Sequence, residues 1–451
     1  MSIYKDCDIR GIYGEEFDEK DAYLIGKAVG TLQRGKRLAV GGDIRLSTPV
    51  LKASLMRGLM ETGIHVIDVG CVTTPMFYYA LDAAEFGTEA PQGGIMVTAS
   101  HNPARYNGFK MMFGNFPVTS EEIKKVENLV HLRDFLTGNG SYETRNVEKN
   151  YAAFIERNCR KGSLKIVLDC CDGATSKIVP QIMETMGYEV SRLYCGYDGN
   201  FPNRNPNPAE YNCLADVCKK VLETGADLGA AYDGDGDRVV FIDNRGHYLT
   251  SEKSFAVFIR QYLKGGPGSF VYDQKSASLV KNTILAYGGM PVMERSGYGF
   301  IKQRFLKERA LAAGEISGHF FFREIGRDDG LYATLKMCEI LEEEGRSLAE
   351  MAEEFPDSII TPNLRVFCPY EEQEKWLDKA AEMGECYPVS RMDGVRIEFA
   401  DGWFLLRKSV TEQAMTYRIE AADAEAFERI RGIVKAAVPE LKESLLNLAK
   451  G

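Results

Sequence analysis

An alternation of aspartate and glycine near the middle of the chain is the clearest sign of chemistry. Asp233, Asp235 and Asp237 are separated by single glycines, and glycine leaves this stretch too flexible for the interior of a strand. Three carboxylates a few ångströms apart repel one another strongly unless a cation lies among them. Oxygen-only ligands suit a hard ion, so the loop is expected to bind Mg²⁺, with a phosphate completing its coordination shell.

Two other interpretations of this loop have different consequences. An EF-hand calcium loop needs Gly at its sixth position and Glu at its twelfth. The chain has Arg238 and Asn244 there, which excludes an EF-hand. A solvated turn rich in Asp and Gly remains an alternative. Residues 228–232 and 239–243 have strand composition, however, and would hold the carboxylates on a rigid frame, which favours the metal site.

Ser100 is the candidate nucleophile. It lies in Thr98-Ala-Ser-His-Asn-Pro103, directly after a predicted strand and before an Asn-Pro turn. Open α/β sheets bind their ligands at such strand ends, although a turn serine that bonds its own backbone is an ordinary alternative. The segment is not the Gly-x-Ser-x-Gly elbow of hydrolases. Together with the aspartate loop, it suggests a serine that accepts a phosphoryl group next to Mg²⁺.

Two further segments carry side chains suited to a sugar phosphate. Lys110 can reach the same site as a proton donor or charge stabiliser, although a surface position is commoner for lysine. Glu315 and Ser317 can point the same way from an extended segment and hydrogen-bond neighbouring sugar hydroxyls, and His319 can add a third contact. A strand-end loop without a ligand would show the same spacing.

The segment from Arg407 to Thr411 leaves a predicted strand and enters a turn. Its arginine, hydroxyls and backbone N–H groups together would make a cradle for phosphate. A polar hairpin end has a similar composition, so this segment by itself does not decide between the two interpretations.

Bulk properties indicate a globular enzyme of several domains. The chain has 451 residues, a hydrophobic content of 45% and a formal charge of −10, which suggests three or four domains and argues against nucleic acid as the main partner. The N-terminus has no signal-peptide core, and no apolar run is long enough to span a membrane. The 11 cysteines are odd in number and scattered, as expected of reduced thiols in a cytoplasmic protein.

Strands that alternate with helices predict mostly parallel sheets of βαβ units over the first three parts of the chain. In the first part, up to about residue 142, strands are expected at 37–40, 65–69 and 93–98 and helices at 21–32 and 50–62. A strand at 165–169 and a helix at 176–186 open the second part. A strand at 268–273 and a helix reaching residue 287 open the third.

The last part, from about residue 362, has a different pattern. Two alternating segments, 394–399 and 403–407, flank Asp401-Gly402, which is a strong hairpin signal. A third strand is expected at 416–420 and a closing helix at 422–437. This part is therefore predicted to be an α+β domain.

These segments, in this order along nearly the whole chain, resemble the α-D-phosphohexomutase superfamily. The form of its sugar loop here is similar to that of the phosphomannomutase/phosphoglucomutase branch, and phosphoglucosamine mutases carry a closely similar loop. The segments that match its phosphoserine, metal, sugar and phosphate loops are Ser100-His-Asn-Pro103, Asp233-Gly-Asp-Gly-Asp-Arg238, Gly314-Glu-Ile-Ser-Gly-His319 and Arg407-x-Ser-x-Thr411. Further family-like segments are Asp8-Ile-Arg-Gly11, Gly42-Asp-x-Arg45, Asn107-Gly-Phe-Lys110, and residues 199–202 with 205–208.

The resemblance implies a four-domain α/β architecture around a central cleft. Three topologically similar mixed α/β domains would carry the phosphoserine, metal and sugar loops, and a C-terminal α+β domain would carry the phosphate loop. The expected boundaries are 1–145, 146–250, 251–360 and 361–451.

The resemblance also implies a mechanism. Phosphorylated Ser100 would donate its phosphoryl group to a hexose phosphate, and the resulting hexose 1,6-bisphosphate would turn round and return its other phosphate. Mg²⁺ would be held by an oxygen on Ser100 and by the three aspartates. The other expected catalytic residues are Arg10, His101, Lys110 and Arg238, and the expected substrate-binding residues are Lys275, Glu315, Ser317, His319, Arg407, Ser409, Thr411 and Arg418.

Two segments depart from the family pattern. The phosphate loop usually reads Ser-Gly-Thr-Glu-Pro or a near variant, and here residues 409–413 read Ser-Val-Thr-Glu-Gln. Val410 is β-branched and resists the positive φ that glycine permits. The branch often has Thr-Gly-His in its third domain, where this chain has Ser296-Gly-Tyr298. A substrate-facing histidine is thus missing or replaced by Tyr298.

The expected activity is the interconversion of hexose 1-phosphates and 6-phosphates, with mannose and/or glucose as the sugar and glucosamine as an alternative. The expected assembly is a monomer or homodimer. A phosphatase of the haloacid dehalogenase kind would use Asp233 and Asp235 as nucleophile and acid/base but leaves Ser100 and residues 314–319 unexplained. A sugar-phosphate binder without catalysis is supported only by the altered loop at 409–413.

Overall fold

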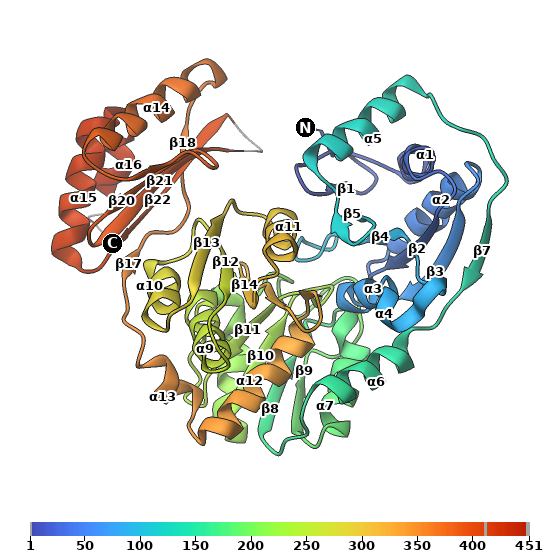
Figure 1. The fold of residues 1–451 in the computed structure, drawn as a ribbon, viewed down its shortest axis with the longest axis horizontal. Coiled ribbons are helices and arrows are strands. Elements are labelled where there is room, and N and C mark those ends of the chain that lie inside the picture. Colours follow the sequence, from blue (N-terminus) through green and yellow to red (C-terminus); the bar gives the residue numbers. More distant parts are fainter. Residues whose placement is uncertain (1, 410–412, 448–451) are drawn as a thin grey trace.

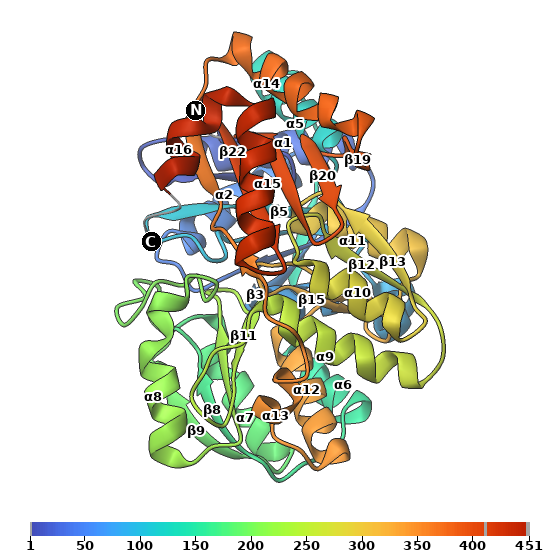
Figure 2. The same ribbon diagram turned by 90° about the vertical axis from the view of Figure 1, so that its left-hand side faces the viewer.

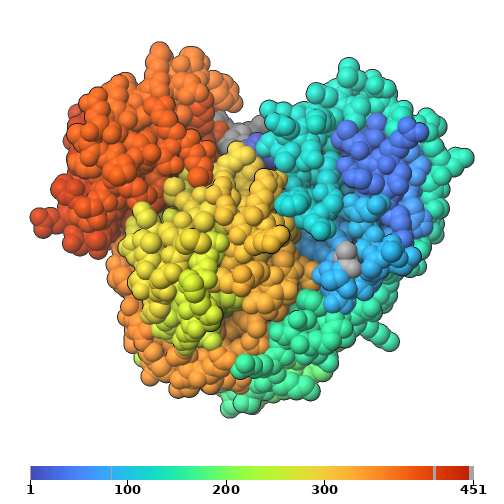
Figure 3. Space-filling view, in the orientation of Figure 1, coloured from blue at the N-terminus to red at the C-terminus, as the bar shows by residue number. Residues whose placement is uncertain are grey.

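The computed structural model describes residues 2–409 and 413–447, in which the strands form four sheets that follow one another along the chain. We call each sheet with its helices a unit, numbered in chain order. Figure 1 shows the units arranged in an arc, with the first and fourth at its two ends. Figure 2 views the arc from the side of the fourth unit. The surface is hollowed between the fourth and first units (Figure 3).

The first unit has a seven-stranded mixed sheet of order β1-β5-β4-β2-β3-β7, with β6 paired to β5. β4, β2, β3 and β7 are parallel neighbours, and β5 is antiparallel to both β4 and β1. Helix α2 begins two residues before the predicted start because Pro49 fits the first turn, where its missing N–H costs nothing. The elements are β1 (Ile9–Ile12), α1 (Glu19–Leu32), β2 (Arg37–Gly42), α2 (Thr48–Met60), β3 (His65–Cys71), α3 (Thr74–Ala80), α4 (Ala83–Phe86), β4 (Gly93–Val97), β5 (Tyr106–Phe113), β6 (Phe116–Pro117), α5 (Ser120–Leu132) and β7 (Ser141–Thr144).

The second unit has a four-stranded sheet of order β11-β10-β8-β9. The three strands β9, β8 and β10 are parallel, and β11 returns antiparallel to β10 after the aspartate loop. The helix expected at 176–186 is a 3-10 turn at Ala174–Lys177 followed by α7, which starts late because Pro180 lies in its first turn. The elements are α6 (Glu148–Asn158), β8 (Lys165–Asp169), α7 (Val179–Thr185), β9 (Glu189–Leu193), α8 (Ala215–Thr224), β10 (Leu228–Tyr232) and β11 (Val239–Ile242).

The third unit has a five-stranded sheet of order β13-β12-β14-β15-β16. β13, β12 and β14 are parallel, and the short strands β15 and β16 are antiparallel additions. The elements are α9 (Ser251–Lys264), β12 (Ser269–Asp273), α10 (Ser278–Ala286), β13 (Met290–Glu294), α11 (Tyr298–Glu308), β14 (Ala312–Gly314), β15 (Phe320–Phe322), β16 (Arg327–Asp328), α12 (Gly330–Glu344) and α13 (Leu348–Ala352).

The fourth unit is the predicted α+β part, and all its strand pairs are antiparallel. The hairpin expected around Asp401-Gly402 is confirmed, because Phe399 of β20 pairs with Gly402 of β21. The closing helix starts at Ala424, where the Asp423 side chain caps the N–H of Ala426. The elements are β17 (Ile359–Ile360), β18 (Leu364–Phe367), α14 (Tyr370–Glu382), β19 (Val389–Ser390), β20 (Val395–Phe399), β21 (Gly402–Lys408), β22 (Ala414–Ala421), α15 (Ala424–Ala437) and α16 (Lys442–Asn447).

The cores explain how the loops are held. One hydrophobic cluster runs continuously through the first three units, whereas the fourth unit has a cluster of its own. The loops at Ser100, Asp233 and Glu315 each follow the carboxyl end of a parallel strand, namely β4, β10 and β14. In open α/β sheets this edge is where ligands bind. The fold is therefore α/β with an α+β addition, as expected.

Candidate active site

The aspartate loop is a buried turn between two fully buried strands. Tyr232 pairs with Val239 across it, so the six residues between them bring Asp233, Asp235 and Asp237 together. One oxygen from each carboxylate lies within 4.8 Å of the others, and all three side chains are fully buried. The solvated turn considered for this loop is therefore wrong.

The loop is held closed by its own backbone. Oδ1 of Asp233 accepts hydrogen bonds from the N–H groups of Gly236 (2.9 Å) and Arg238 (3.2 Å). Gly236 has a φ of 82°, in the left-handed region that favours glycine. A Cβ at this position would also lie 2.5 Å from Cγ2 of Thr175. Glycine is therefore required here for both conformation and space.

The electrostatics of the loop fit a cation. Burial, and then the neighbouring carboxylates, raise the pKa of Asp233 well above its usual value. Burial also raises the pKa of Asp237, but the charges of Lys110 and His319 outweigh burial and hold this pKa well below the usual value of an aspartate. Oδ1 of Asp235 is buried and accepts no hydrogen bond from the described residues, and Oδ1 of Asp237 has the His319 ring 3.3 Å away. A buried carboxylate oxygen without a donor, such as Oδ1 of Asp235, is what a hard divalent ion would use.

Ser100 lies against this loop. Its Oγ donates a 2.6 Å hydrogen bond to Oδ2 of Asp233, and its side chain is fully buried. Its φ of 49° is unusual for a residue other than glycine and is stabilised by a 2.8 Å hydrogen bond from its N–H to Oγ1 of Thr98. The structure thus places the predicted nucleophile in direct contact with a predicted metal ligand.

Arg45 holds the Ser100 loop, and sequence reasoning did not place it in the site. Its guanidinium is fully buried and pairs with Asp43, with 3.0 Å between Nε and Oδ2. It also donates to four backbone carbonyls, those of Ser100, Asn102 and Pro103 at 2.7 Å and of Tyr106 at 3.1 Å. The available signal was the Gly-Asp-x-Arg motif at the end of a strand, which carries no indication of these partners.

Lys110 is part of the site and not a surface lysine. Its Nζ lies 2.9 Å from Oδ2 of Asp235 and 2.5 Å from Oδ2 of Asp237, and its side chain is almost wholly buried. Burial lowers its pKa, but Asp235 and Asp237 outweigh burial and raise the pKa above the usual value. Lys110 is therefore a cation fixed beside the aspartate loop.

Arg10 and Arg238 add positive charge around the same loop. Arg10 donates to Oδ1 of Asn102 (2.8 Å) and to Oδ2 of Asp8 (2.6 Å), which ties it to the Ser100 loop. Nε of Arg238 lies 3.8 Å from Oδ2 of Asp233. Both arginines therefore place positive charge beside the Ser100 loop and the aspartate loop.

His101 lies among these cations. Burial, and then the charges of Arg238, Arg10 and Lys110, hold its pKa well below 6.5. Its Nδ1 is buried and has no hydrogen-bond partner among the described residues. The ring therefore presents a buried nitrogen that no described residue uses.

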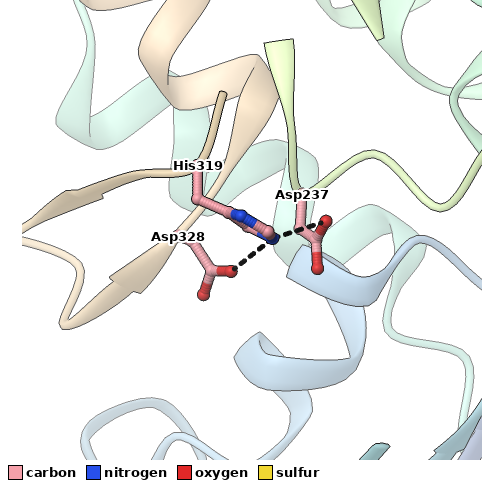
Figure 4. Close-up of side chains that lie close together, drawn as sticks. All are labelled: Asp237, His319 and Asp328. Carbon is pink, nitrogen blue, oxygen red and sulfur yellow. Dashed lines mark ion pairs between the residues drawn. The ribbon is translucent and has the colours of Figure 1, made fainter. Parts of the chain in front are cut away.

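Glu315, Ser317 and His319 meet in the loop between β14 and β15. Ser317 Oγ donates to Oε2 of Glu315 (2.8 Å), and the same oxygen lies 2.9 Å from Nδ1 of His319. Burial lowers the pKa of His319, but Asp237 and Glu315 outweigh it and raise the pKa to about 9. Figure 4 shows the imidazole between the carboxylates of Asp237 (3.3 Å) and Asp328 (3.9 Å).

The remaining predicted residues gather where the third unit meets the fourth. Arg418 donates to the carbonyls of Thr361 (2.8 Å) and Lys275 (3.1 Å), and Arg407 pairs with Asp393 at 2.7 Å. Burial lowers the pKa of Lys275, and the nearby Arg407 adds to this. These three cations would suit an anionic group.

The phosphate loop itself is described only in part. The N–H of Ser409 donates to the carbonyl of Ala414 (2.9 Å) at the β21–β22 pair. Val410 and Thr411 lie outside the described residues.

Comparisons with known proteins agree along nearly the whole chain. Residues 1–137, 146–246 and 250–359 match domains I, II and III, each alpha/beta/alpha, of the family described as phosphoglucomutase/phosphomannomutase. The chain is 37% identical to a phosphomannomutase/phosphoglucomutase of Pseudomonas syringae pv. tomato, over 98% of this chain and 96% of the relative. It is 36% identical to a phosphoglucomutase of Neisseria gonorrhoeae, over 97% of this chain and 96% of that relative.

A solved structure gives the same result. A phosphoglucomutase/phosphomannomutase family protein from Burkholderia thailandensis superimposes with a TM-score of 0.90 at 33% identity, covering 97% of this chain and 98% of the other. Within residues 2–409 and 413–447, no helix has the length and apolar content needed to cross a membrane.

Proposed function

Because the chain belongs to the phosphoglucomutase/phosphomannomutase family, we propose that it interconverts the 1- and 6-phosphates of glucose and mannose. The reaction would proceed through phosphorylated Ser100 and a hexose 1,6-bisphosphate. The observation that carries the proposal is the 2.6 Å hydrogen bond from Ser100 to Asp233, inside a buried cluster of three carboxylates. A serine in contact with a cation site is suited to carry a phosphoryl group.

Mg²⁺ is the proposed metal. Asp233, Asp235 and Asp237 would hold it, together with an oxygen of phosphorylated Ser100. When bound, it would neutralise charge on the phosphoryl group during transfer. Oδ1 of Asp235, which is buried and accepts no hydrogen bond from any residue that the structure describes, supports this ligand set.

In the first half of the reaction, a sugar hydroxyl oxygen would bond to the phosphorus on Ser100 as the bond between phosphorus and Ser100 Oγ breaks. In the second half, Ser100 Oγ would bond to the other phosphorus of the bisphosphate as the bond between that phosphorus and its sugar oxygen breaks. One proton would pass from the sugar hydroxyl to Ser100 Oγ in the first half and back to the released sugar oxygen in the second. His101, whose buried Nδ1 has no hydrogen-bond partner among the described residues, would lie beside the transferring group as a further catalytic residue. Lys110, Arg10 and Arg238 would supply positive charge around the phosphoryl group.

The sugar phosphate would be bound by two further sets of residues, one in the loop between β14 and β15 and one where the third unit meets the fourth. Glu315, Ser317 and His319 would bind sugar hydroxyls common to both orientations of the intermediate. The phosphate that is not being transferred would be bound by Lys275, Arg407, Ser409, Thr411 and Arg418. The arginines and lysine of this set lie at the junction of the third and fourth units, which supports the assignment.

Product analysis tests the proposal. The protein is mixed with Mg²⁺, glucose 1-phosphate and a trace of glucose 1,6-bisphosphate, and glucose 6-phosphate and free phosphate are quantified. Glucose 6-phosphate without phosphate release is expected, and the Ser100→Ala variant should be folded and inactive. Near-normal rates in that variant would contradict the nucleophile assignment.

The same assay separates the alternatives. Mannose and glucosamine phosphates rank the substrates, and a strong preference for glucosamine phosphate would replace the assignment to glucose and mannose. Free phosphate as the main product would favour a phosphatase, in which Asp233 and not Ser100 would be the nucleophile. An acid-stable phosphoserine on the protein would support the mutase, whereas a labile acyl phosphate would contradict it.

The organisation of the chain is also a proposal. We divide it after residues 145 and 250 and, because β17 (Ile359–Ile360) pairs with β22 of the fourth sheet, we move the third boundary from residue 360 to residue 358. All 11 cysteines are free, which supports a cytoplasmic protein. We propose a monomer or homodimer, and light scattering on the purified protein would distinguish them.

A further inference from the structure

Tyr298 makes three contacts on three separate segments of the chain. It is the first residue of α11 and is buried. Its ring stacks on the ring of His319, with 6.1 Å between centroids and 26° between planes. Nζ of Lys110 lies 5.3 Å from the centroid of the Tyr298 ring. The Tyr298 hydroxyl donates to the backbone carbonyl of Cys7 at 3.2 Å.

From these contacts we propose that Tyr298 is a positioning residue. Its ring fixes Lys110 and His319 relative to one another, and its hydroxyl fixes both to the N-terminal segment that carries Arg10. The inference rests on the roles proposed above for Lys110 and His319. It assigns Tyr298 no contact with the substrate.

The ring contacts complete the surroundings of both groups. Two sides of the Lys110 ammonium are taken by Asp235 and Asp237, and the aromatic face stabilises the cation on another side. His319 is bonded at its edges to Asp237 and Glu315, and the ring of Tyr298 restrains the tilt that these bonds leave free. One aromatic side chain thus sets the distance between a cation of the first unit and an imidazole of the third.

The hydroxyl contact links two units. Cys7 precedes Asp8 and Arg10, and Arg10 is bonded to the Ser100 loop through Asn102. Neighbouring residues of α11 also pack on the first unit. A Cβ at Gly299 would lie 3.1 Å from Sγ of Cys7, and Gln303 donates to the carbonyl of Pro117 at 3.1 Å. Figure 1 shows α11 at this junction.

Tyr298 does not itself transfer a proton. Its hydroxyl is committed to the Cys7 carbonyl, and burial raises the pKa of the phenol well above its usual value. A tyrosine at this position therefore acts through its ring and its hydrogen bond. Replacement of the ring and replacement of the hydroxyl have different expected effects.

The test compares Tyr298→Leu with Tyr298→Phe in the Mg²⁺-dependent mutase assay. Leu removes both ring contacts, and kcat should fall about 30-fold, while Phe keeps the ring and should stay within about threefold of wild type. Phe270→Leu is the matched control, because Phe270 is also a buried ring of the third unit and its ring contact is with Phe255. The control should lose stability without the loss in kcat.

A double-mutant cycle provides the readout that a purely structural role would not move. With Lys110→Met as the background, Tyr298→Leu should cost less than about threefold in kcat, because the pair has already been broken. Independent effects in the cycle, normal kcat in Tyr298→Leu, or a Phe variant as slow as the Leu variant would each overturn the inference. A wild-type protein without mutase activity would instead refute the proposed function, and the inference would fall with it.

Discussion

The substitution Arg45→Lys tests how the Ser100 loop is held. The guanidinium of Arg45 makes five hydrogen bonds, one to Asp43 and four to backbone carbonyls of residues 100–106. A lysine ammonium has three donors, so at least two of these buried acceptors lose their partner. Each lost hydrogen bond costs about 1–3 kcal/mol, which gives a total of about 2–6 kcal/mol.

The cost should be concentrated in the loop and appear as a loss of rate. If only the lower figure of about 2 kcal/mol opposes the catalytic position of Ser100, kcat falls about 30-fold. Initial rates of the mutase reaction give kcat, and hydrogen exchange at residues 98–106 reports the loop directly. The matched control is Arg37→Lys, because Arg37 forms a half-exposed ion pair with Glu89 in the same unit.

Two results separate this reasoning from general destabilisation. Urea unfolding should show that Arg45→Lys leaves most of the protein folded under assay conditions, so that the rate refers to the native state. Unchanged kcat and unchanged exchange in a folded Arg45→Lys protein would refute the argument that Arg45 holds Ser100 in place.

Two further predictions follow from buried charges. Asp235→Asn keeps the hydrogen bonds from Thr74 and Thr98 but removes a carboxylate, so half-saturation by Mg²⁺ should require at least about tenfold more metal; an unchanged titration would remove Asp235 from the proposed ligands. Lys302 is buried beside Asp328, and burial lowers its pKa to about 8. Between pH 8 and the higher pKa of the unfolded chain, the unfolded state binds the proton and the folded state does not, so this lysine makes stability rise with pH. The unfolding free energy of the wild type minus that of Lys302→Met should therefore increase from pH 7.5 to 9.5. A difference that does not change with pH would contradict the lowered pKa of Lys302.

The local parts of the fold were predictable because their signals are local. The strands on either side of the aspartate loop and the hairpin at Asp401-Gly402 depend on alternation and turn residues within about ten positions, and both formed as expected. Helix starts were less accurate. At α2 and α7 the prolines in the first turn decide where the helix begins.

The sequence by itself determined the kinds of groups available: three carboxylates on a flexible loop, a serine at a strand end and a set of cations. Only the tertiary structure decided which of them meet. Lys110 and Asp237 are 127 residues apart in the chain, and Nζ of the one lies 2.5 Å from Oδ2 of the other. The sequence around Arg45 gives no indication that its side chain bonds to the backbone carbonyl of Ser100. The physical reason is that a buried charge is stable only with its partners, and the packing of whole sheets brings those partners from distant parts of the chain.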